Sequence, residues 1–545
     1  MTSIELTEVS ALGFEVFEQH TVIPIRRLTL LYGPNSAGKS SIEEIFSLLQ
    51  GLCTPVGRLR GATSFDAHPY FRGERLSRCW RRESDAPLKR VDHMTIGVAG
   101  RVIDDTADDV EIGGISWLRF SQTVSIDFRF RVDLDSSEYP ASLADEVLSS
   151  PRADFIGPVR RDFMIHVDGD ILFAFDDGRA IGINRSHPIF STTLKSWGYT
   201  LDGVDRVMGK SDAFRQDSGI LWLDDAGIDL SPERRFRRLR GMVQAEHTIP
   251  GLSHAVRSII DLGNLIVLPL FRAFSETFRC TMVPASRTIP SSENLAFLLE
   301  RSKVGEDHPW FHIGAKGDAR YRKLAMAFAR QLSEKNRRGL ARNYVDQINK
   351  MLTSHLFGER GYFIGMDYRV VLTGDDLQRI RSNKQGDIQF NDYAMLVRLF
   401  LTDSEGRHYS FSEVGSGLGY VFPVLCELCD PNSRMVQLQQ PELHLHPAMQ
   451  SGLGDVLLDT VKLHSNLIVE THSEHLLLRI LKRIRQRKYR DTKDLSANDI
   501  AVLYFEPKEK GTTDVHQLRI SDDGDFIDKW PRGFFMERDA ELWDE

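Results

Sequence analysis

The segment from Gly33 to Ser40 reads GPNSAGKS and fits the phosphate-binding pattern G-x-x-x-x-G-K-S/T. An apolar run from Leu28 to Leu31 precedes it and a segment with helical spacing follows it, so we expect a buried strand, a loop and a helix. Backbone N–H groups of such a loop and helix start converge on one point and favour an anion there. Lys39 would reach the outer phosphates of a nucleotide, and the Ser40 hydroxyl would ligate Mg²⁺. The apolar face of the expected helix comprises Ile42, Ile45, Phe46 and Leu49.

A second stretch, MVQLQQPELHLHP (435–447), has the pattern of a buried strand that ends at a polar turn. In ATPases with such a strand, an acid at its end holds Mg²⁺ and a second acid orients the attacking water. Those two positions are Gln439 and Gln440 here. A neutral amide positions water but is no general base at pH 7, so ATP binding should survive better than hydrolysis. Glu442, two residues further on, is the alternative base.

Two more segments near the C-terminus could contact phosphate. FSEVGSGLGYVFPVLCEL opens a helix-like run at Gly415, Ser416 and Gly417, and amides at a helix start suit an anion, although an ordinary helix start has the same composition. NLIVETHSEHLLLRI predicts a strand at 467–469 followed by His472 and a helix. A histidine at a strand's carboxyl end lies where open α/β sheets bind ligands.

The order of these four segments resembles that of ABC-type ATPase heads. PE-x-HLHP and the later DGDFIDKWPRGFF resemble the RecF/OLD-like branch in particular, which includes the PtuA-type ATPase subunits of Septu and retron anti-phage systems. The resemblance implies an α/β fold: a P-loop sheet with an antiparallel β subdomain and a largely helical insertion. We therefore expect head lobe I at 1–185, a mainly helical insertion at 186–360, and head lobe II with a short tail at 361–545.

The resemblance also assigns roles to individual residues, with ATP and Mg²⁺ as cofactors. The catalytic group would be Gln440, Glu442 and the switch histidine His472. The phosphate contacts would be Asn35, Ser36, Gly38, Lys39, Ser40 and Ser41, joined by Gly415, Ser416 and Gly417, which would reach the nucleotide of a second copy. The metal ligands would be Ser40 and Gln439, and His444–Pro447 would lie between two heads. Phe14 and Phe17 are candidates for adenine stacking, and a metal-approaching loop should lie near 62–68.

Composition limits the class of protein and of partner. The 545 residues carry a net charge of −8, so nucleic acid could bind only through local basic clusters, which occur at 72–82, 234–240 and 479–490. The third is the densest and is the preferred contact, the alternative for each being a solvated helix face. The sequence contains no apolar run of membrane-spanning length and begins without a signal-peptide pattern, and its five cysteines read as reduced thiols. We expect a cytoplasmic protein.

The middle of the chain predicts antiparallel strands followed by helices. VSIDFRFRV, ADFIGPVRRDFMIHV and DILFAFDD have strand patterns, and LARNYVDQINKMLTSHLF has helical spacing. In CELC, the apolar face of a helix accounts for Cys426 and Cys429 better than half a zinc site does. HLH would place the side chains of His444 and His446 on the same side of the backbone if that segment were an extended strand.

Together these features predict an ATP-binding subunit of an anti-phage complex that associates with copies of itself through its heads. It would regulate a separate effector nuclease, with the HNH type as first choice, because the segment after His472 shows no cluster of catalytic acids. The alternative is a RecF/SMC-like DNA-repair ATPase with active hydrolysis.

Overall fold

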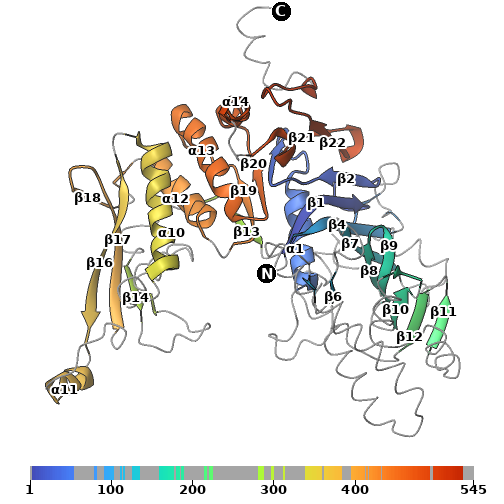
Figure 1. Ribbon diagram of the computed structural model, residues 1–545, viewed down its shortest axis with the longest axis horizontal. Coiled ribbons are helices and arrows are strands. Elements are labelled where there is room, and N and C mark those ends of the chain that lie inside the picture. The colour runs from blue at the N-terminus through green and yellow to red at the C-terminus, as the bar shows by residue number, and fades with distance from the viewer. Residues whose placement is uncertain are drawn as a thin grey trace, which may run out of the picture. The chain divides into compact units, whose positions relative to one another are not determined.

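The computed structural model has two compact units, which are described separately below (Figure 1). The residues it describes are 3–53, 79–82, 91, 93–103, 111–112, 115–116, 125–134, 159–176, 180–184, 186–188, 214–217, 220–224, 280–287, 296–299, 311–312, 338–358, 361–372, 374–382, 394–410, 413–414, 416–430, 433–490 and 495–531. Unit 1 is Met1–Cys280 with Ala501–Leu518, and unit 2 is Thr281–Ile500 with Arg519–Glu545. The predicted three-part division stays a prediction.

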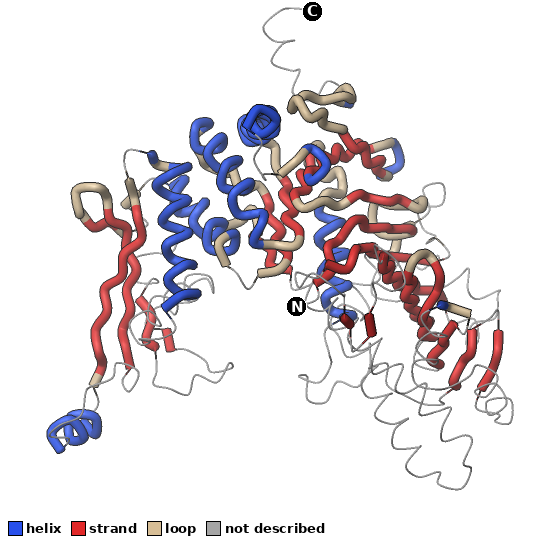
Figure 2. The backbone as a smooth tube through the Cα atoms, viewed as in Figure 1, coloured by secondary structure: helices blue, strands red, loops and turns tan. Residues whose placement is uncertain are grey.

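Unit 1 contains a nine-stranded antiparallel sheet (Figure 2) in the order β11-β12-β10-β9-β8-β7-β4-β1-β2. The strands are β1 Ser3–Leu12, β2 Thr21–Pro24, β4 His93–Ile103, β7 Ser125–Leu134, β8 Val159–Val167, β9 Asp170–Asp176, β10 Ala180–Asn184, β11 Phe214–Asp217 and β12 Ile220–Asp224. Two short strands, β5 Glu111–Ile112 and β6 Ile115–Ser116, pair separately. The antiparallel strands predicted for this region are confirmed in β7, β8 and β9.

The predicted strand–loop–helix is also in unit 1. β3 (Leu28–Tyr32) is buried along its length, and α1 (Ser40–Cys53) follows the loop. β21 (Ile500–Pro507) lies next to β3 and pairs with β22 (Thr513–Leu518), and a 3-10 turn (Glu509–Gly511) lies between these two strands. The predicted apolar face of α1 is confirmed, since its four side chains are fully buried: Ile42, Ile45, Phe46 and Leu49.

Unit 2 contains the remaining motifs. Strands β13 (Cys280–Val283), β19 (Met435–Gln439) and β20 (Asn466–Glu470) are neighbours in one sheet, with β19 and β20 parallel. The helices that follow the motifs are α12 (Ser416–Leu428), α13 (Pro447–Thr460) and α14 (Glu474–Arg490). Helix α13 packs against α14, and short 3-10 turns occupy Val461–Leu463 and Ala497–Asp499.

A second antiparallel sheet of unit 2 comprises β14 (Ala296–Leu299), β15 (Phe311–His312), β16 (Phe363–Val371), β17 (Ala394–Thr402) and β18 (His408–Tyr409). The predicted helix near 340 is confirmed as α10 (Arg338–Met351), which continues into a π-helical turn, Leu352–Leu356; α11 spans Gly374–Ser382. The Tyr344 hydroxyl donates to the Cys426 carbonyl at 2.9 Å and so ties α10 to α12.

The predicted fold class, α/β with a P-loop sheet and an antiparallel β subdomain, is confirmed. Within 186–360 the described residues form α10 and several short strands, and most of the predicted helical insertion lies outside the described residues. Cys426, on α12, and Cys429, directly after it, are buried thiols that form no disulfide, as the apolar-face interpretation predicted. None of the helices in the described part of the chain is long and apolar enough to cross a membrane.

Candidate nucleotide-binding site

The loop between β3 and α1 has the backbone conformation that its glycines permit. Gly33 and Gly38 have φ values of 141° and 87°, and Ser36, a residue with a side chain, has φ 63°. The Ala37 amide donates to the Pro34 carbonyl at 3.3 Å, which closes a tight turn. Asn35, Ser36 and Ser40 are exposed on this loop, where a phosphate could reach them.

Lys39 is held over the loop by the loop's own carbonyl groups. Its ammonium donates to the carbonyl oxygens of Gly33 and Pro34, both at 2.9 Å, and the side chain is only 3% exposed. A buried ammonium is costly without an anion or several hydrogen bonds. The loop therefore presents a pre-positioned positive charge at the start of α1, the end of a helix that favours anions.

Three segments of unit 1 support the loop from outside. A Cβ at Gly38 would come within 2.4 Å of Val16, and a Cβ at Gly33 would come within 2.6 Å of the Phe505 carbonyl oxygen. The Thr513 hydroxyl donates to the Ala37 carbonyl at 2.9 Å. The loop is thus packed against the chain before β2 and against β21 and β22, segments that the sequence motif does not include.

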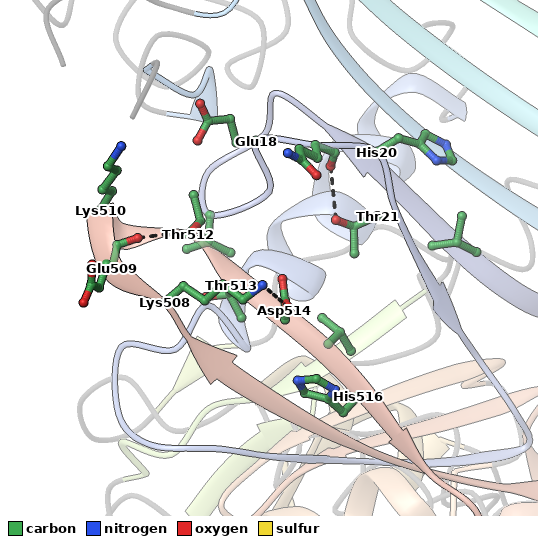
Figure 3. Close-up of a pocket in the computed structure, with 14 residues that line it drawn as sticks. Glu18, His20, Thr21, Lys508, Glu509, Lys510, Thr512, Thr513, Asp514 and His516 are labelled. Carbon is green, nitrogen blue, oxygen red and sulfur yellow. Dashed lines mark hydrogen bonds and ion pairs between the residues drawn. The ribbon is translucent and has the colours of Figure 1, made fainter. Parts of the chain in front are cut away.

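A cleft of about 590 Å³ lies beside this loop (Figure 3). Residues 18–22, 508–510 and 512–516 line it together with Val16, which would contact a side chain at Gly38. Both acidic and basic side chains line this cleft. Two of them, Lys508 and Asp514, form an ion pair. The volume is within the usual range for small-molecule sites, roughly 300–1,000 Å³.

Phe14 and Phe17 do not line this cleft. The two residues form an isolated bridge with each other, and both rings are essentially fully buried, at 0% and 1% exposure. The suggestion that one of them stacks on adenine is therefore wrong for this conformation. The sequence could not reveal this, because the burial results from packing against distant residues such as Trp80, which bridges Phe14.

The end of β19 in unit 2 carries the two glutamines. The backbone N–H of Gln440 donates to the backbone carbonyl of Glu470 at 2.7 Å, and Gln440 has φ 42°, in the left-handed region. The Gln439 side-chain oxygen accepts the Ala285 amide at 3.1 Å. Gln439 therefore contributes to the connection between β19 and the segment after β13.

Arg287 completes this connection and was not predicted as a site residue. Its guanidinium donates to the carbonyl oxygens of Gln439 at 2.9 Å and Gln440 at 2.8 Å, and the residue is buried. It is about 150 positions from the glutamines in sequence and belongs to no motif, so no local pattern could reveal it. A buried guanidinium that binds two successive carbonyls fixes the course of the turn after β19.

Glu442 and His472 are brought together by a backbone contact. A Glu442 carboxylate oxygen accepts the His472 amide at 2.8 Å, and burial raises the pKa of Glu442 against several opposing hydrogen bonds. The Glu442 carboxylate therefore holds the backbone at the start of the turn that contains His472. The predicted roles of Gln440, Glu442 and His472 in catalysis stay predictions.

The Gly-Ser-Gly helix start and the HLH turn are also adjacent. A Cβ at Gly417 would lie 2.9 Å from the His444 carbonyl oxygen, and the ring of Tyr420 lies 4.4 Å from that of His444, centroid to centroid. His444 has φ 64°, and His446 caps α13 by accepting the Ala448 amide at 3.3 Å. The segment is therefore a turn, and the extended arrangement with both rings on one side is wrong. Gly415 lies outside the described residues.

The predicted Mg²⁺ ligands fit the ion only in part. Mg²⁺ prefers one or two carboxylates together with phosphate oxygens and water. The side-chain oxygen of Gln439 accepts the Ala285 backbone N–H and carries no negative charge, and its role as a ligand stays a prediction. Ser40 is exposed at the start of α1 and fits.

The basic segment 479–490 forms most of α14, and three of its arginines form ion pairs with carboxylates of unit 2. Arg479 and Arg483 both bind the buried carboxylate of Asp455, at 2.5 and 2.6 Å, and Arg485 binds Asp525 at 2.6 Å. The tail that carries DGDF packs on this helix, since a Cβ at Gly524 would lie 2.3 Å from the Leu481 carbonyl oxygen. Nucleic-acid binding by this segment stays a prediction.

Several predicted features fall outside the described residues. These are the metal-approaching loop near 62–68, the basic cluster at 234–240, most of the cluster at 72–82, and the end of the DGDFIDKWPRGFF segment.

The chain matches no protein-family model and no curated protein. Solved structures similar to it include an Smc head domain with an extended coiled coil bound to the C-terminal domain of ScpA, from Pyrococcus furiosus, at 9% identity and TM-score 0.35, covering 100% of this chain and 99% of that one. Another is the SMC head domain from Thermotoga maritima, at 9% identity and TM-score 0.34, covering 95% and 100%. These scores are too low to carry the function of those proteins over to this chain.

Proposed function

We propose that this chain is an ATP-binding subunit built on an ABC-type head, in which nucleotide binding rather than rapid hydrolysis is the regulatory event. The observation that carries the proposal is the phosphate loop: a buried, carbonyl-held Lys39 beside a glycine that has no room for a Cβ. A cation held over a glycine loop at the start of a helix favours a bound phosphate. The proposed triphosphate would bind at residues 35–41, and its ribose and base would occupy the adjacent cleft at 16–22 and 508–516.

Slow turnover is proposed from the residues at the end of β19. By resemblance to ABC-type heads, Gln440 takes the position of the acid that orients the attacking water, and an amide has no basicity at pH 7. Glu442 is buried and accepts a backbone amide, which suits a positioning role better than proton transfer. Loss of one positioned base typically lowers a rate by about 10²–10⁴-fold.

The biological setting proposed is anti-phage defence. Support comes from the PE-x-HLHP and DGDF elements, which resemble PtuA-type subunits of the RecF/OLD-like branch. In this proposal the ATP-bound heads associate through Ser416 and the His444–Pro447 turn, and the assembly regulates a separate HNH-type nuclease in the cytoplasm. Brisk hydrolysis would instead favour a RecF/SMC-like DNA-repair ATPase.

The test is equilibrium binding of a slowly hydrolysed, labelled ATP analogue to the full chain. Lys39→Ala should abolish binding, since it removes the loop's buried cation, whereas Lys350→Ala, an exposed lysine on α10, should retain it. Unchanged affinity in Lys39→Ala would remove the phosphate-loop assignment. Co-purification with the product of the neighbouring gene, followed by phage challenge, tests the defence setting separately.

A further inference from the structure

Helix α10 lies against one face of the antiparallel sheet of unit 2 (Figure 1). The backbone N–H of Ile364, on β16, donates to the side-chain oxygen of Asn349, on α10, at 2.7 Å. Ile364 is 3% exposed, and its register partner on β17, Leu401, is fully buried. Side chains of a strand alternate between the two faces, so the residues next to these two extend from the opposite face of the sheet.

The opposite face carries an aromatic cluster, Phe363, Phe400 and His408, on three adjacent strands. Phe363 on β16 and His408 on β18 are the two register partners of Thr402 on β17, and both are exposed. Phe400 lies two residues before Thr402, and its ring is stacked on the His408 ring, with centroids 4.1 Å apart and an interplanar angle of 24°. Single exposed apolar side chains are ordinary, whereas a cluster of them marks an interaction site.

A glycine on β16 sets the position of the Phe400 ring. Gly365 is the register partner of Phe400, and a Cβ at Gly365 would lie 2.5 Å from a ring carbon of Phe400. The ring thus occupies the space that a side chain at position 365 would fill. Held between this backbone and the His408 ring, it has little rotamer freedom to lose when a ligand binds, which favours binding. The aromatic cluster is therefore a preformed stack rather than a set of mobile side chains.

Charged side chains of both signs surround the aromatic cluster. Arg369 on β16 and Arg398 on β17 extend from the same face, and both are exposed. The exposed Asp367 is the register partner of Arg398, and the Glu413 carboxylate lies close enough to Arg398 for a favourable interaction. These opposite charges offset one another, so the face attracts phosphate only weakly. Stacking on the rings must therefore provide most of the binding energy of a planar ligand.

We propose that the aromatic cluster, with Arg369 and Arg398 beside it, is a binding surface for single-stranded nucleic acid, whose unpaired bases stack on the exposed rings. Aromatic rings on the open face of an antiparallel sheet, with arginines nearby, are the means by which sheet-based domains hold unpaired bases. DNA and RNA strands offer the same base faces to such rings. The surface is separate from the proposed nucleotide site and from the basic segment 479–490.

The test is fluorescence anisotropy of the full chain with a labelled single strand of about 12 nucleotides, once as DNA and once as RNA. Wild-type protein should bind both, and should bind the DNA duplex of the same sequence more weakly, because paired bases do not open to the rings. The strand that binds more tightly identifies the source of the bases. Two arginine contacts to phosphate predict a shallow salt dependence, with a slope of about −1.4 in logarithmic terms.

Phe363→Ala and His408→Ala should each weaken single-strand binding by roughly 5- to 100-fold, the loss expected when one base no longer stacks. Phe363→Leu keeps an apolar side chain without an aromatic face and should lose most of the same affinity. Leu478→Ala, at an exposed apolar residue of α14, is the matched control and should bind as wild type. Lys39→Ala should do so as well, since this surface does not depend on nucleotide.

Both substituted rings are exposed, so thermal unfolding should change little in these variants, which separates binding from folding. Wild-type affinity in Phe363→Ala and His408→Ala overturns the inference, and so does a duplex that binds as tightly as the single strand. Full affinity in Phe363→Leu with loss in Phe363→Ala would indicate an apolar protein-docking surface instead. Absence of binding to either strand also overturns the inference and leaves the proposed nucleotide site intact.

Discussion

Replacing Gly38 with alanine should distort the phosphate loop for two separate physical reasons. At φ 87°, a side chain costs about 1–2 kcal/mol in backbone strain. The new Cβ would also lie 2.4 and 2.9 Å from the two methyl carbons of Val16, and overpacking of this kind costs about 1–3 kcal/mol. The sum is about 2–5 kcal/mol. If the loop relaxes to avoid this cost, ATP affinity should fall at least roughly tenfold, since about 1.4 kcal/mol is a factor of ten.

Two matched variants separate these contributions. Gly169 has φ 89°, and a Cβ added there would meet no atom within 4 Å, so Gly169→Ala measures the strain alone, about 1–2 kcal/mol. Val16→Ala in the Gly38→Ala background removes the two shortest contacts, leaves the Cβ of residue 16 at 3.1 Å, and should recover most of about 1–3 kcal/mol. The assays are urea unfolding and binding of the labelled ATP analogue, analysed as a double-mutant cycle. Zero coupling between positions 16 and 38, or wild-type behaviour of Gly38→Ala, would refute the packing argument.

Three further predictions concern unit 2. Ser416→Arg, at the start of α12, should prevent ATP-dependent association while single-site ATP binding persists; sedimentation with and without the analogue checks this, and loss of both properties together would contradict it. Glu442→Gln keeps an acceptor for the His472 amide and removes a carboxyl whose pKa is raised by burial. A raised pKa in the folded state stabilises the fold below the ordinary carboxyl pKa, about 4.3, and that stabilisation is lost as the pH rises through the raised value. The variant should therefore gain stability relative to wild type in urea unfolding as the pH rises from about 4 through the raised pKa, and parallel pH profiles would contradict this. Gln439→Asp combined with Gln440→Glu should raise steady-state phosphate release by up to about 10²-fold, and an unchanged rate would show that the missing acids do not limit turnover.

Sequence patterns correctly predicted the elements that depend only on neighbouring residues in the chain. The phosphate loop, α1 and the strand β19 were predicted correctly, because each is determined by spacing within a short window. The polar turn after β19 was predicted as well, but the contact of His444 with Tyr420 was not, because Tyr420 belongs to α12, a helix outside that window.

Residues that act through distant contacts could not be predicted. Arg287 binds the carbonyls after β19 from a segment about 150 residues earlier, and nothing in its own neighbourhood marks it. The pairing of Glu470 with Gln439 is visible only in the register of β19 and β20. Pairing between strands is a tertiary property, so the sequence near either residue does not encode it alone.

We propose that the chain binds ATP at Lys39 and retains it uncleaved. The most direct test is to incubate the protein with ATP and Mg²⁺, isolate the protein by rapid gel filtration, and identify the bound nucleotide beside a Lys39→Ala control. We expect bound nucleotide to be ATP in the wild type, with little phosphate released, and no bound nucleotide in the control. Bound ADP with brisk phosphate release that depends on Lys39 would contradict the claim and indicate a working ATPase with a base other than Gln440.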